Sequence, residues 1–311
     1  DDLGIGAGVA VRVGGGAQHA QLLRLDRRGV ARSERPEQVS YSTPRFSPDG
    51  RRIAVGTSSG GRTFELWILD RVRGTRQRLT LDGAADWPEW TPDGRRLAFG
   101  FIPTAGTSWD VHGAAADGSS ATESLVAGPR TEAPGGWSAD GALVFYRASQ
   151  ARGDILYRDS AGVEHPFAAT AANETAPTLS PDGRWLAFVS DESGLREVHV
   201  RPFPSGEGRW QVSTDGGTEP RWSKHGREII YRRAERFLAV AVVPGPGFSI
   251  GRTDTLFSGP YEASGGRAQY DVSRDGSEFI VVGTGAETRT LSVLLNPFTG
   301  LFDARGRNPA R

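Results

Sequence analysis

The sequence predicts an all-β fold built from repeated four-stranded antiparallel sheets, and three observations carry this prediction. One short motif returns along the chain at intervals of 42 to 50 residues. Each copy is followed by apolar runs of strand length rather than by a sustained helical period of 3.6 residues. The 311 residues also include 42 glycines and 19 prolines, a density of turn formers that suits many short strands.

The repeated motif is an apolar or aromatic residue followed by Ser-Pro-Asp-Gly-Arg and a second apolar run. Its full copies span residues 44–55, 88–99 and 177–188, and looser copies span residues 137–141, 222–226 and 272–276. The serine or threonine of each copy, which we call the anchor, stands at position 47, 91, 138, 180, 223 or 273, so the spacings are 44, 47, 42, 43 and 50 residues. A period in the low to mid forties is the length of one β-propeller blade.

Each copy of the motif has the chemistry of a tight turn. Proline presets φ, aspartate bonds its own backbone, and glycine adopts the left-handed conformation. The predicted turn residues are Asp49, Gly50, Asp93, Gly94, Asp140, Gly141, Asp182, Gly183, Gly226, Asp275 and Gly276. An aspartate that recurs at one turn favours this local role over a ring of carboxylates for cations, and the sequence contains no D-x-D-x-D-G calcium loop.

Four strands are expected in each repeat. The motif supplies the first two, on either side of the turn. Third strands are expected further along each repeat, at residues 66–69, 155–157, 197–200 and 237–240. Fourth strands are expected at residues 78–80, 166–167, 211–213 and 255–257. Four antiparallel strands per repeat form a propeller blade, and we expect almost no helix.

The number of blades follows from the length of chain that lies outside the six anchors, before residue 47 and after residue 273. The stretch from anchor 273 to the C-terminus, added to the stretch before anchor 47, has the length of two periods. We therefore expect a single domain over residues 1–311 with seven blades, starting near residues 3, 47, 91, 138, 180, 223 and 273. Residues 21–25 would be the third strand of the first blade, and residues 291–295 and 301–302 would complete the last. Six blades is the alternative, if the N-terminal strands complete the last sheet.

Composition excludes several classes of protein. The 37 basic and 37 acidic side chains cancel, which argues against a nucleic-acid partner. Without cysteine there is no disulfide framework, thiolate nucleophile or cysteine-based metal site. No apolar run approaches the roughly 18 residues of a membrane span.

The motif Ser180-Pro181-Asp182-Gly183-Arg184 with its following strand resembles the TolB-like, WD-like propeller repeat of bacterial extracytoplasmic proteins. A narrower resemblance is to the C-terminal propellers of bacterial receptor-type serine/threonine kinases. It rests on residues 180–187, 200–204, 210–217, 219–220, 270–273 and 293–296. This resemblance implies a sensing or interaction module outside the membrane. Because the chain lacks the glycine-rich loop, Val-Ala-Ile-Lys, His-Arg-Asp and Asp-Phe-Gly elements, we do not expect it to phosphorylate.

Three patterns that could carry chemistry are better explained by structure. Residues 56–60 match G-x-S-x-G, but they fall between strands two and three of a blade, so we expect a hairpin loop rather than a nucleophile elbow. Residues 4–8 are glycine-rich, but they lack the preceding strand and following helix of a dinucleotide fingerprint, so we expect a blade turn. The histidines show no zinc-site spacing and are expected to be structural or solvated: His19, His112, His165, His199 and His225.

Aromatic and arginine residues repeat in phase with the motif. The aromatics before the anchors are expected to be core wedged between sheets rather than a stacking platform for a sugar or nucleotide: Phe46, Trp90, Trp137 and Trp222. Trp109, Trp210 and Tyr261 are less regular and are expected nearer the surface. The arginines after the turns are expected on one face, where they could dock an acidic partner: Arg51, Arg52, Arg95, Arg96 and Arg184.

The favoured function is a non-enzymatic, periplasmic propeller that acts as a protein-interaction, scaffold or sensor subunit docked on a membrane complex. We expect no catalytic, cofactor-binding or metal-binding residues, and contacts through the loops at residues 58–63, 102–108, 148–153 and 258–267. The alternative is an enzyme, or a propeller that binds a small ligand or glycan at its central channel. A channel cluster of His, Asp and Arg with a metal or bound ligand would favour the alternative, whereas a dry or merely hydrated channel and a large apolar patch on one face would favour the interaction module.

Overall fold

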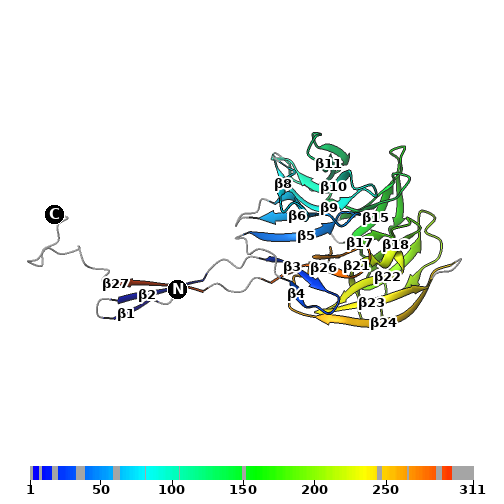
Figure 1. Cartoon of the computed structure of the whole chain (residues 1–311). Helices are drawn as coiled ribbons and strands as arrows, with labels where there is room; N and C mark the ends of the chain where they lie inside the picture. The colour runs from blue at the N-terminus through cyan, green and yellow to red at the C-terminus, as the bar shows by residue number, and fades with distance from the viewer. Residues whose placement is uncertain are drawn as a thin grey trace, which may run out of the picture. The chain divides into compact units, whose positions relative to one another are not determined.

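The computed structural model describes residues 3–6, 9–15, 20–32, 39–58, 64–80, 82–104, 106–148, 152–243, 247–264, 266–284 and 289–295. The chain divides into two units, one of residues 20–284 and one of residues 1–19 together with 285–311. The larger unit contains six four-stranded antiparallel sheets, which are the blades of a β-propeller (Figure 1). Each blade runs from an innermost to an outermost strand.

The first three blades follow one another along the chain. Blade one consists of β5 (Ser40–Phe46), β6 (Arg52–Ser58), β7 (Glu65–Asp70) and β8 (Arg76–Arg78). Blade two consists of β9 (Ala84–Trp90), β10 (Arg96–Ile102), β11 (Asp110–Ala115) and β12 (Glu123–Val126). Blade three consists of β13 (Glu132–Trp137), β14 (Leu143–Ala148), β15 (Gly153–Arg158) and β16 (Glu164–Ala168).

The next two blades continue the same order. Blade four consists of β17 (Glu174–Leu179), β18 (Trp185–Ser190), β19 (Glu197–Pro202) and β20 (Trp210–Gln211). Blade five consists of β21 (Thr218–Ser223), β22 (Glu228–Arg233), β23 (Arg236–Val243) and β24 (Ser249–Ser258). The 3₁₀ turn η1 (Lys224–Gly226) is the only helical element among the described residues. None of these residues belongs to a helix long and apolar enough to cross a membrane.

Blade six closes the ring with strands from both ends of the larger unit. Its inner strands are β25 (Tyr270–Val272) and β26 (Glu278–Gly283), and its outer strands are β3 (Gln21–Asp26) and β4 (Ala31–Arg32). Strand β3 pairs with β26 over its whole length, from Glu278 opposite Asp26 to Gly283 opposite Gln21. The N-terminal strands therefore complete the last sheet.

The prediction of seven blades is wrong, and the structure has six. The chain outside anchors 47 and 273 does not hold two blades, because part of it forms a separate sheet. In that sheet β1 (Leu3–Gly6) pairs with β2 (Val9–Gly15), which pairs with β27 (Arg289–Leu295). The expected blade near residue 3 is this sheet, residues 21–25 are the third strand of blade six, and residues 291–295 lie in β27. Residues 301–302 lie outside the described residues.

The turn of the motif has the expected local geometry. The predicted positive φ is present at Gly50, Gly94, Gly183 and Gly276, with values of 68°, 67°, 71° and 76°. In the first copy the Ser47 hydroxyl donates to Asp49 Oδ1 at 2.5 Å, and the Arg51 N–H donates to the same oxygen at 3.0 Å. The Thr91–Asp93, Ser180–Asp182 and Ser273–Asp275 pairs repeat this arrangement. These aspartates satisfy backbone N–H groups, which is why the residue recurs.

The core is divided into six apolar clusters, one between each pair of neighbouring blades. Phe46, Trp90 and Trp222 are each 8% exposed and belong to three of these clusters, as expected of core aromatics. The cluster that joins blade six to blade one contains Leu22 of β3 together with Ile280 and Phe46. Burial of apolar surface between sheets is therefore continuous around the closed ring.

Candidate functional site

The centre of the ring is lined by one residue from each blade, two positions before the anchor. We call this the channel position. Its occupants are Arg45, Glu89, Gly136, Thr178, Arg221 and Asp271, and all six line one cavity of about 230 Å³. The cavity also meets Ser47, Pro92 and Ser180, so it lies at the face of the ring that carries the Ser-Pro-Asp-Gly turns. We call this face the turn face and the cavity the turn-face cavity.

In four of the blades, a bulge in the innermost strand aims the channel position. Thr43, Trp87, Ala176 and Glu219 stand four residues before their anchors, and their φ values are 40°, 60°, 51° and 56°. Positive φ is uncommon outside glycine. Each of these residues precedes a proline, and the pairing of its strand with the second strand changes register there. Bulges of this kind turn the following side chain toward a new direction.

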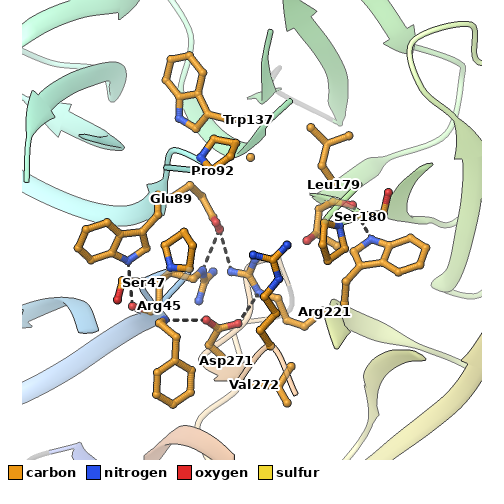
Figure 2. Close-up of a pocket in the computed structure, with 18 of the residues that line it drawn as sticks. Arg45, Ser47, Glu89, Pro92, Trp137, Leu179, Ser180, Arg221, Asp271 and Val272 are labelled. Atoms are coloured by element: carbon orange, nitrogen blue, oxygen red, sulfur yellow. Dashed lines mark hydrogen bonds and ion pairs between the residues drawn. The ribbon is translucent and has the colours of Figure 1, made fainter. Parts of the chain in front are cut away.

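Four charged side chains meet at the floor of the cavity (Figure 2). Glu89 Oε1 accepts hydrogen bonds from Arg45 Nε and from an Arg221 terminal nitrogen, both at 2.8 Å. Asp271 accepts the Phe46 N–H at 2.8 Å, and its Oδ1 lies 3.8 Å from Arg221 Nε. Two arginines and two carboxylates thus form one network, and none of the four side chains is more than 15% exposed.

Burial shifts the pKa of both carboxyl groups upward. Loss of water around Glu89 raises its pKa to about 7, although Arg45 opposes the shift; the charge of Asp271 adds to it. Burial also raises the pKa of Asp271, against the opposing effects of Arg45 and of backbone hydrogen bonds from Phe46 and Val272. A carboxyl group that titrates near neutral pH inside a cavity is a candidate functional group.

Behind the floor of the cavity, on the side away from the turn face, the ring centre narrows. There the Arg267 guanidinium lies 3.5 Å from the Trp87 ring centre and 5.6 Å from the Tyr146 ring centre. Burial lowers the pKa of Arg267 to about 10, so its charge persists at neutral pH. The space left behind the floor is about 20 Å³, which holds about one water molecule.

The walls of the cavity use the aromatics that the sequence assigned to the core. Phe46, Trp90, Trp137 and Trp222 all line it, so they serve both the packing between blades and the cavity. The Trp90 N–H donates to the Arg45 carbonyl at 3.1 Å, and the Trp222 N–H donates to the Thr178 carbonyl at 3.0 Å. Each of these bonds joins one blade to the channel position of the preceding blade.

The other residues considered from the sequence lie elsewhere. Arg51, Arg95 and Arg184 are exposed on the turn face, whereas Arg52 and Arg96 are half-buried. Trp109, Trp210 and Tyr261 are half-buried. Gly56 to Ser58 end strand β6 rather than lying in a hairpin loop, and residues 59–60 lie outside the described residues. Gly4 and Gly6 belong to β1, where a blade turn was expected, and residues 7–8 lie outside the described residues.

Of the four histidines in the described residues, none lines the cavity. His199 in β19 is 1% exposed, and burial lowers its pKa to about 4. His112 packs on Phe101, and His165 lies 2.8 Å from an oxygen of Asp159. His225 occupies the turn η1, and His19 lies outside the described residues. In the part of the chain that the structure describes, no three His, Cys, Asp or Glu side chains are grouped so that they could hold a metal ion.

The charged network was missed by the sequence analysis, although a signal for it existed. Arg45, Glu89, Arg221 and Asp271 stand at one position of the repeat, in phase with the anchors. Polar residues in phase with the repeat mark the ring centre, just as the aromatics in phase mark the packing between blades.

Comparison with known proteins supports the fold and leaves the activity open. No family model matches the chain. The curated relative that matches is the uncharacterized peptidase YuxL of Bacillus subtilis, 30% identical over 109 residues. The match covers 34% of this chain and 15% of that protein, so the chain spans a small part of the length of its relative.

Solved structures of similar fold include TolB proteins. The putative TolB of Agrobacterium tumefaciens has a TM-score of 0.67 at 19% identity, over 87% of this chain and 100% of that one. TolB of Acinetobacter baumannii has a TM-score of 0.57 at 17% identity, over 88% and 66%. The chain has a TolB-like β-propeller fold. An oligogalacturonate lyase in complex with manganese is also similar, with a TM-score of 0.53 at 15% identity over 97% and 83%. The same fold thus occurs in an enzyme.

Proposed function

We propose that this chain is a non-enzymatic β-propeller that binds a protein partner at its turn face. The observation that carries the proposal is the turn-face cavity, which narrows behind its floor and is walled by Phe46, Trp90 and Trp222. The two carboxylates of its floor are held by arginines of the same chain. Aromatic walls with a charged floor are typical of sites that receive one anchoring group of a partner.

The surface around the cavity supports the same proposal. Arg51, Arg95 and Arg184 are exposed near the Ser-Pro-Asp-Gly turns. Arginines on the rim of an interface steer an acidic partner and fix its orientation. The resemblance to TolB-like and kinase-associated propellers favours an extracytoplasmic location and a role as a scaffold or sensor subunit of a membrane-anchored complex.

A second candidate function, catalysis at the channel, is favoured by one specific observation. Glu89 has a pKa raised to about 7 and lines a cavity, which is the setting of a general acid or base. Turnover of a peptide, ester, glycan or phosphate substrate that Glu89→Gln abolishes would establish this function in place of the first.

Capture of partners from native membranes, followed by mass spectrometry, tests the favoured function. The bait is the whole chain, and the test variant replaces Arg51, Arg95 and Arg184 with glutamate. The control is Arg236→Glu, since Arg236 is exposed beside the turn between the second and third strands of blade five, which lies at the opposite face. We expect a protein that is captured by the unmodified chain and the control but lost by the test variant. Equal capture by all three baits would contradict binding at the turn face.

A further inference from the structure

Behind the floor of the turn-face cavity, the ring centre contains a second and smaller space, which we call the inner space. Its volume of about 20 Å³ is enough for about one water molecule. Much of its wall is apolar and comes from the innermost strands of blades three, four and five: Ala133, Pro134, Ala176, Pro177 and Pro220. Proline has no N–H group, so this part of the wall offers few donors to an occupant. The charged residues of the lining therefore decide what the inner space can hold.

Positive charge predominates among the side chains that line the inner space. Arg45, Arg221 and Arg267 line it, whereas Glu89 is the only carboxylate that does so among the described residues. Arg45 and Arg221 both donate to Glu89 Oε1, so one negative charge serves two arginines (Figure 2). The charge of Arg267 is left over in this lining.

Arg267 is the arginine that presents an unused donor. Its guanidinium carbon lies 3.5 Å from the Trp87 ring centre and 5.6 Å from the Tyr146 ring centre. Both of these aromatic residues also line the inner space, so the guanidinium is held beside it. The Nη2 of Arg267 is buried and makes no hydrogen bond to any residue that the structure describes. A buried charged donor without an acceptor is costly, so an acceptor is expected next to it.

The acids of the ring centre do not fully balance its arginines. Asp86 attracts Arg267, but its oxygens already accept hydrogen bonds from the N–H of the next residue and from two hydroxyl groups of blade one. Burial raises the pKa of Asp86, of Glu89 and of Asp271. Glu89, whose pKa is about 7, is half protonated at neutral pH. Positive charge is therefore incompletely compensated in a buried place, which is unfavourable unless an anion is added.

We propose that the inner space binds a chloride ion beside the Arg267 guanidinium. A single-atom anion of about the size of a water molecule suits this volume, whereas sulfate, phosphate and carboxylates are larger. Chloride only accepts hydrogen bonds, and a guanidinium only donates them. The ion joins charges of blades one, two and five around Arg267, so it should stabilise the closed ring. This inference is independent of the proposed function, because the inner space lies behind the floor and not at the turn face.

Glu89 makes the binding of chloride depend on pH. The titratable and charged groups around it are Arg45 of β5, Asp86 of β9, Tyr146 of β14, Arg221 of β21, Arg267 in the segment before β25, and Asp271 of β25. Arg267 stays charged, since its pKa is about 10, whereas the pKa of Glu89 is about 7. From pH 8 to pH 6 Glu89 gains a proton and loses the negative charge that repels the ion. Chloride should therefore bind more tightly at pH 6, by up to about ten-fold.

Thermal unfolding of the whole chain in three sodium salts measures the binding of the ion. Sodium chloride, sodium bromide and sodium gluconate are compared at pH 6 and at one ionic strength, so that screening of surface charges is equal. We expect the unfolding midpoint to be about 3 °C or more higher in about 100 mM chloride or bromide than in gluconate, whose anion is too large for the inner space. Anomalous diffraction from crystals grown in sodium bromide should show a peak in the inner space beside Arg267.

Three variants separate the inner space from general effects of salt. Arg267→Gln removes the charge beside the space, so its midpoint should be the same in chloride and gluconate. Arg236→Gln is the control, since it removes an exposed arginine of β23, and it should keep the full chloride shift. Each variant is compared with itself in two salts, so a change in its basal stability does not affect the result. Glu89→Gln cannot ionise, and its affinity for chloride should be equal at pH 6 and pH 8.

Equal midpoints of the native chain in chloride and gluconate would overturn the chloride site, and water as the sole occupant would give this result without a bromide peak. A chloride shift that survives in Arg267→Gln would also overturn it. A bromide peak without a chloride shift in solution would identify an adventitious ion only and would contradict the proposal. If Arg267→Gln does not fold, the native chain and Glu89→Gln decide, because equal chloride affinities of the native chain at pH 6 and pH 8 would contradict an ion beside Glu89.

Discussion

At the scale of single residues, the molecule separates two uses of charge. The turn aspartates Asp93 and Asp275 are largely exposed and accept local hydrogen bonds, which hold their pKa values below the ordinary one. Glu89 and Asp271 are buried at the ring centre, where burial raises their pKa values. An aspartate in a turn therefore stabilises that turn as a carboxylate, whereas the buried Asp271 at the ring centre has a raised pKa.

The raised pKa of Glu89 predicts a specific pH dependence of stability. In the unfolded chain the group titrates near 4.5, and in the folded chain near 7, so between these values the folded state holds the extra proton. Its contribution to stability is complete below about pH 4.5 and is lost as the pH rises through 7. Since one unit of pKa is about 1.4 kcal/mol, the complete loss is on the order of 3 kcal/mol.

Urea unfolding at pH 5, 6 and 7.5 gives the free energy of unfolding of the native chain and of Glu89→Gln. The effect is the difference between the two proteins in how this free energy changes with pH. The native chain should lose more unfolding free energy over this range than the variant does. Glu192→Gln is the control, because Glu192 is exposed and its pKa is lowered by Arg209. Parallel pH profiles for the native chain and Glu89→Gln would show that Glu89 ionises normally in the fold.

The glycine of the turn allows a second prediction at this scale. Gly183 has φ 71°, and a Cβ placed there meets nothing closer than 3.9 Å, so a substitution introduces backbone strain rather than a clash. Gly183→Val should lower the unfolding free energy by about 1 kcal/mol or more. Gly247→Val is the control, since Gly247 has no neighbour within 4 Å and no positive φ. Chemical denaturation measures the unfolding free energy of both variants. An equal loss in both would show that the positive φ of Gly183 is not the cause of the destabilisation.

At the scale of elements, the outermost strands decide how the ring is closed. Strand β3 places Leu25 in the cluster with Phe257 and Phe279, where Leu25 is 1% exposed. The residues that follow turn the chain into β4, and Val30 in this turn is 58% exposed. The same hairpin thus carries Leu25, which packs in the core of blade six, and Val30, which faces solvent.

This difference predicts the effect of truncating each side chain. Leu25→Ala should destabilise the chain by about 2–5 kcal/mol, because it opens a cavity between blades five and six. Val30→Ala on the same hairpin should change stability by less than about 0.5 kcal/mol. Thermal unfolding of both variants measures the difference. A small effect of Leu25→Ala would mean that β3 does not close the ring in solution.

The sequence predicted the repeating unit well because the repeat itself encodes it. Ser-Pro-Asp-Gly turns require particular residues, and apolar runs of strand length flank them, so blades, turns and core aromatics could be located from residue types alone. Ring closure could not be predicted in this way. A third strand such as residues 21–25 looks the same whether it belongs to the first blade or the last, and only its pairing with Glu278–Gly283 decides.

The candidate site was predicted in part. The aromatics of its walls were found because they are large and recur in phase, but they were assigned to packing alone. Arg45, Glu89, Arg221 and Asp271 are of different types and mixed charge, so they do not form a visible motif. They become a site only because the ring brings residues as distant in the sequence as Arg45 and Asp271 to one axis.

At the scale of the whole molecule, residues 20–284 contain all the strands of the six blades. The ring is completed by β3 and β4 pairing with β26, and each interface between blades has its own apolar cluster. Sheet β1-β2-β27 pairs within the other unit. The hydrogen bonds of the blades therefore close without residues 1–19 or 285–311.

Two truncations test this closure. A chain of residues 20–284 should keep the near-ultraviolet circular dichroism of the full chain and unfold in one cooperative transition at a similar temperature, because every blade retains its four strands. A chain of residues 33–284 lacks β3 and β4, which leaves β26 with an unpaired edge and the clusters without Leu22 and Leu25. It should unfold at a markedly lower temperature or aggregate. Equal stability of the two truncated chains would contradict ring closure by the N-terminal strands, whereas loss of structure in the longer one would show that the six blades depend on the second unit.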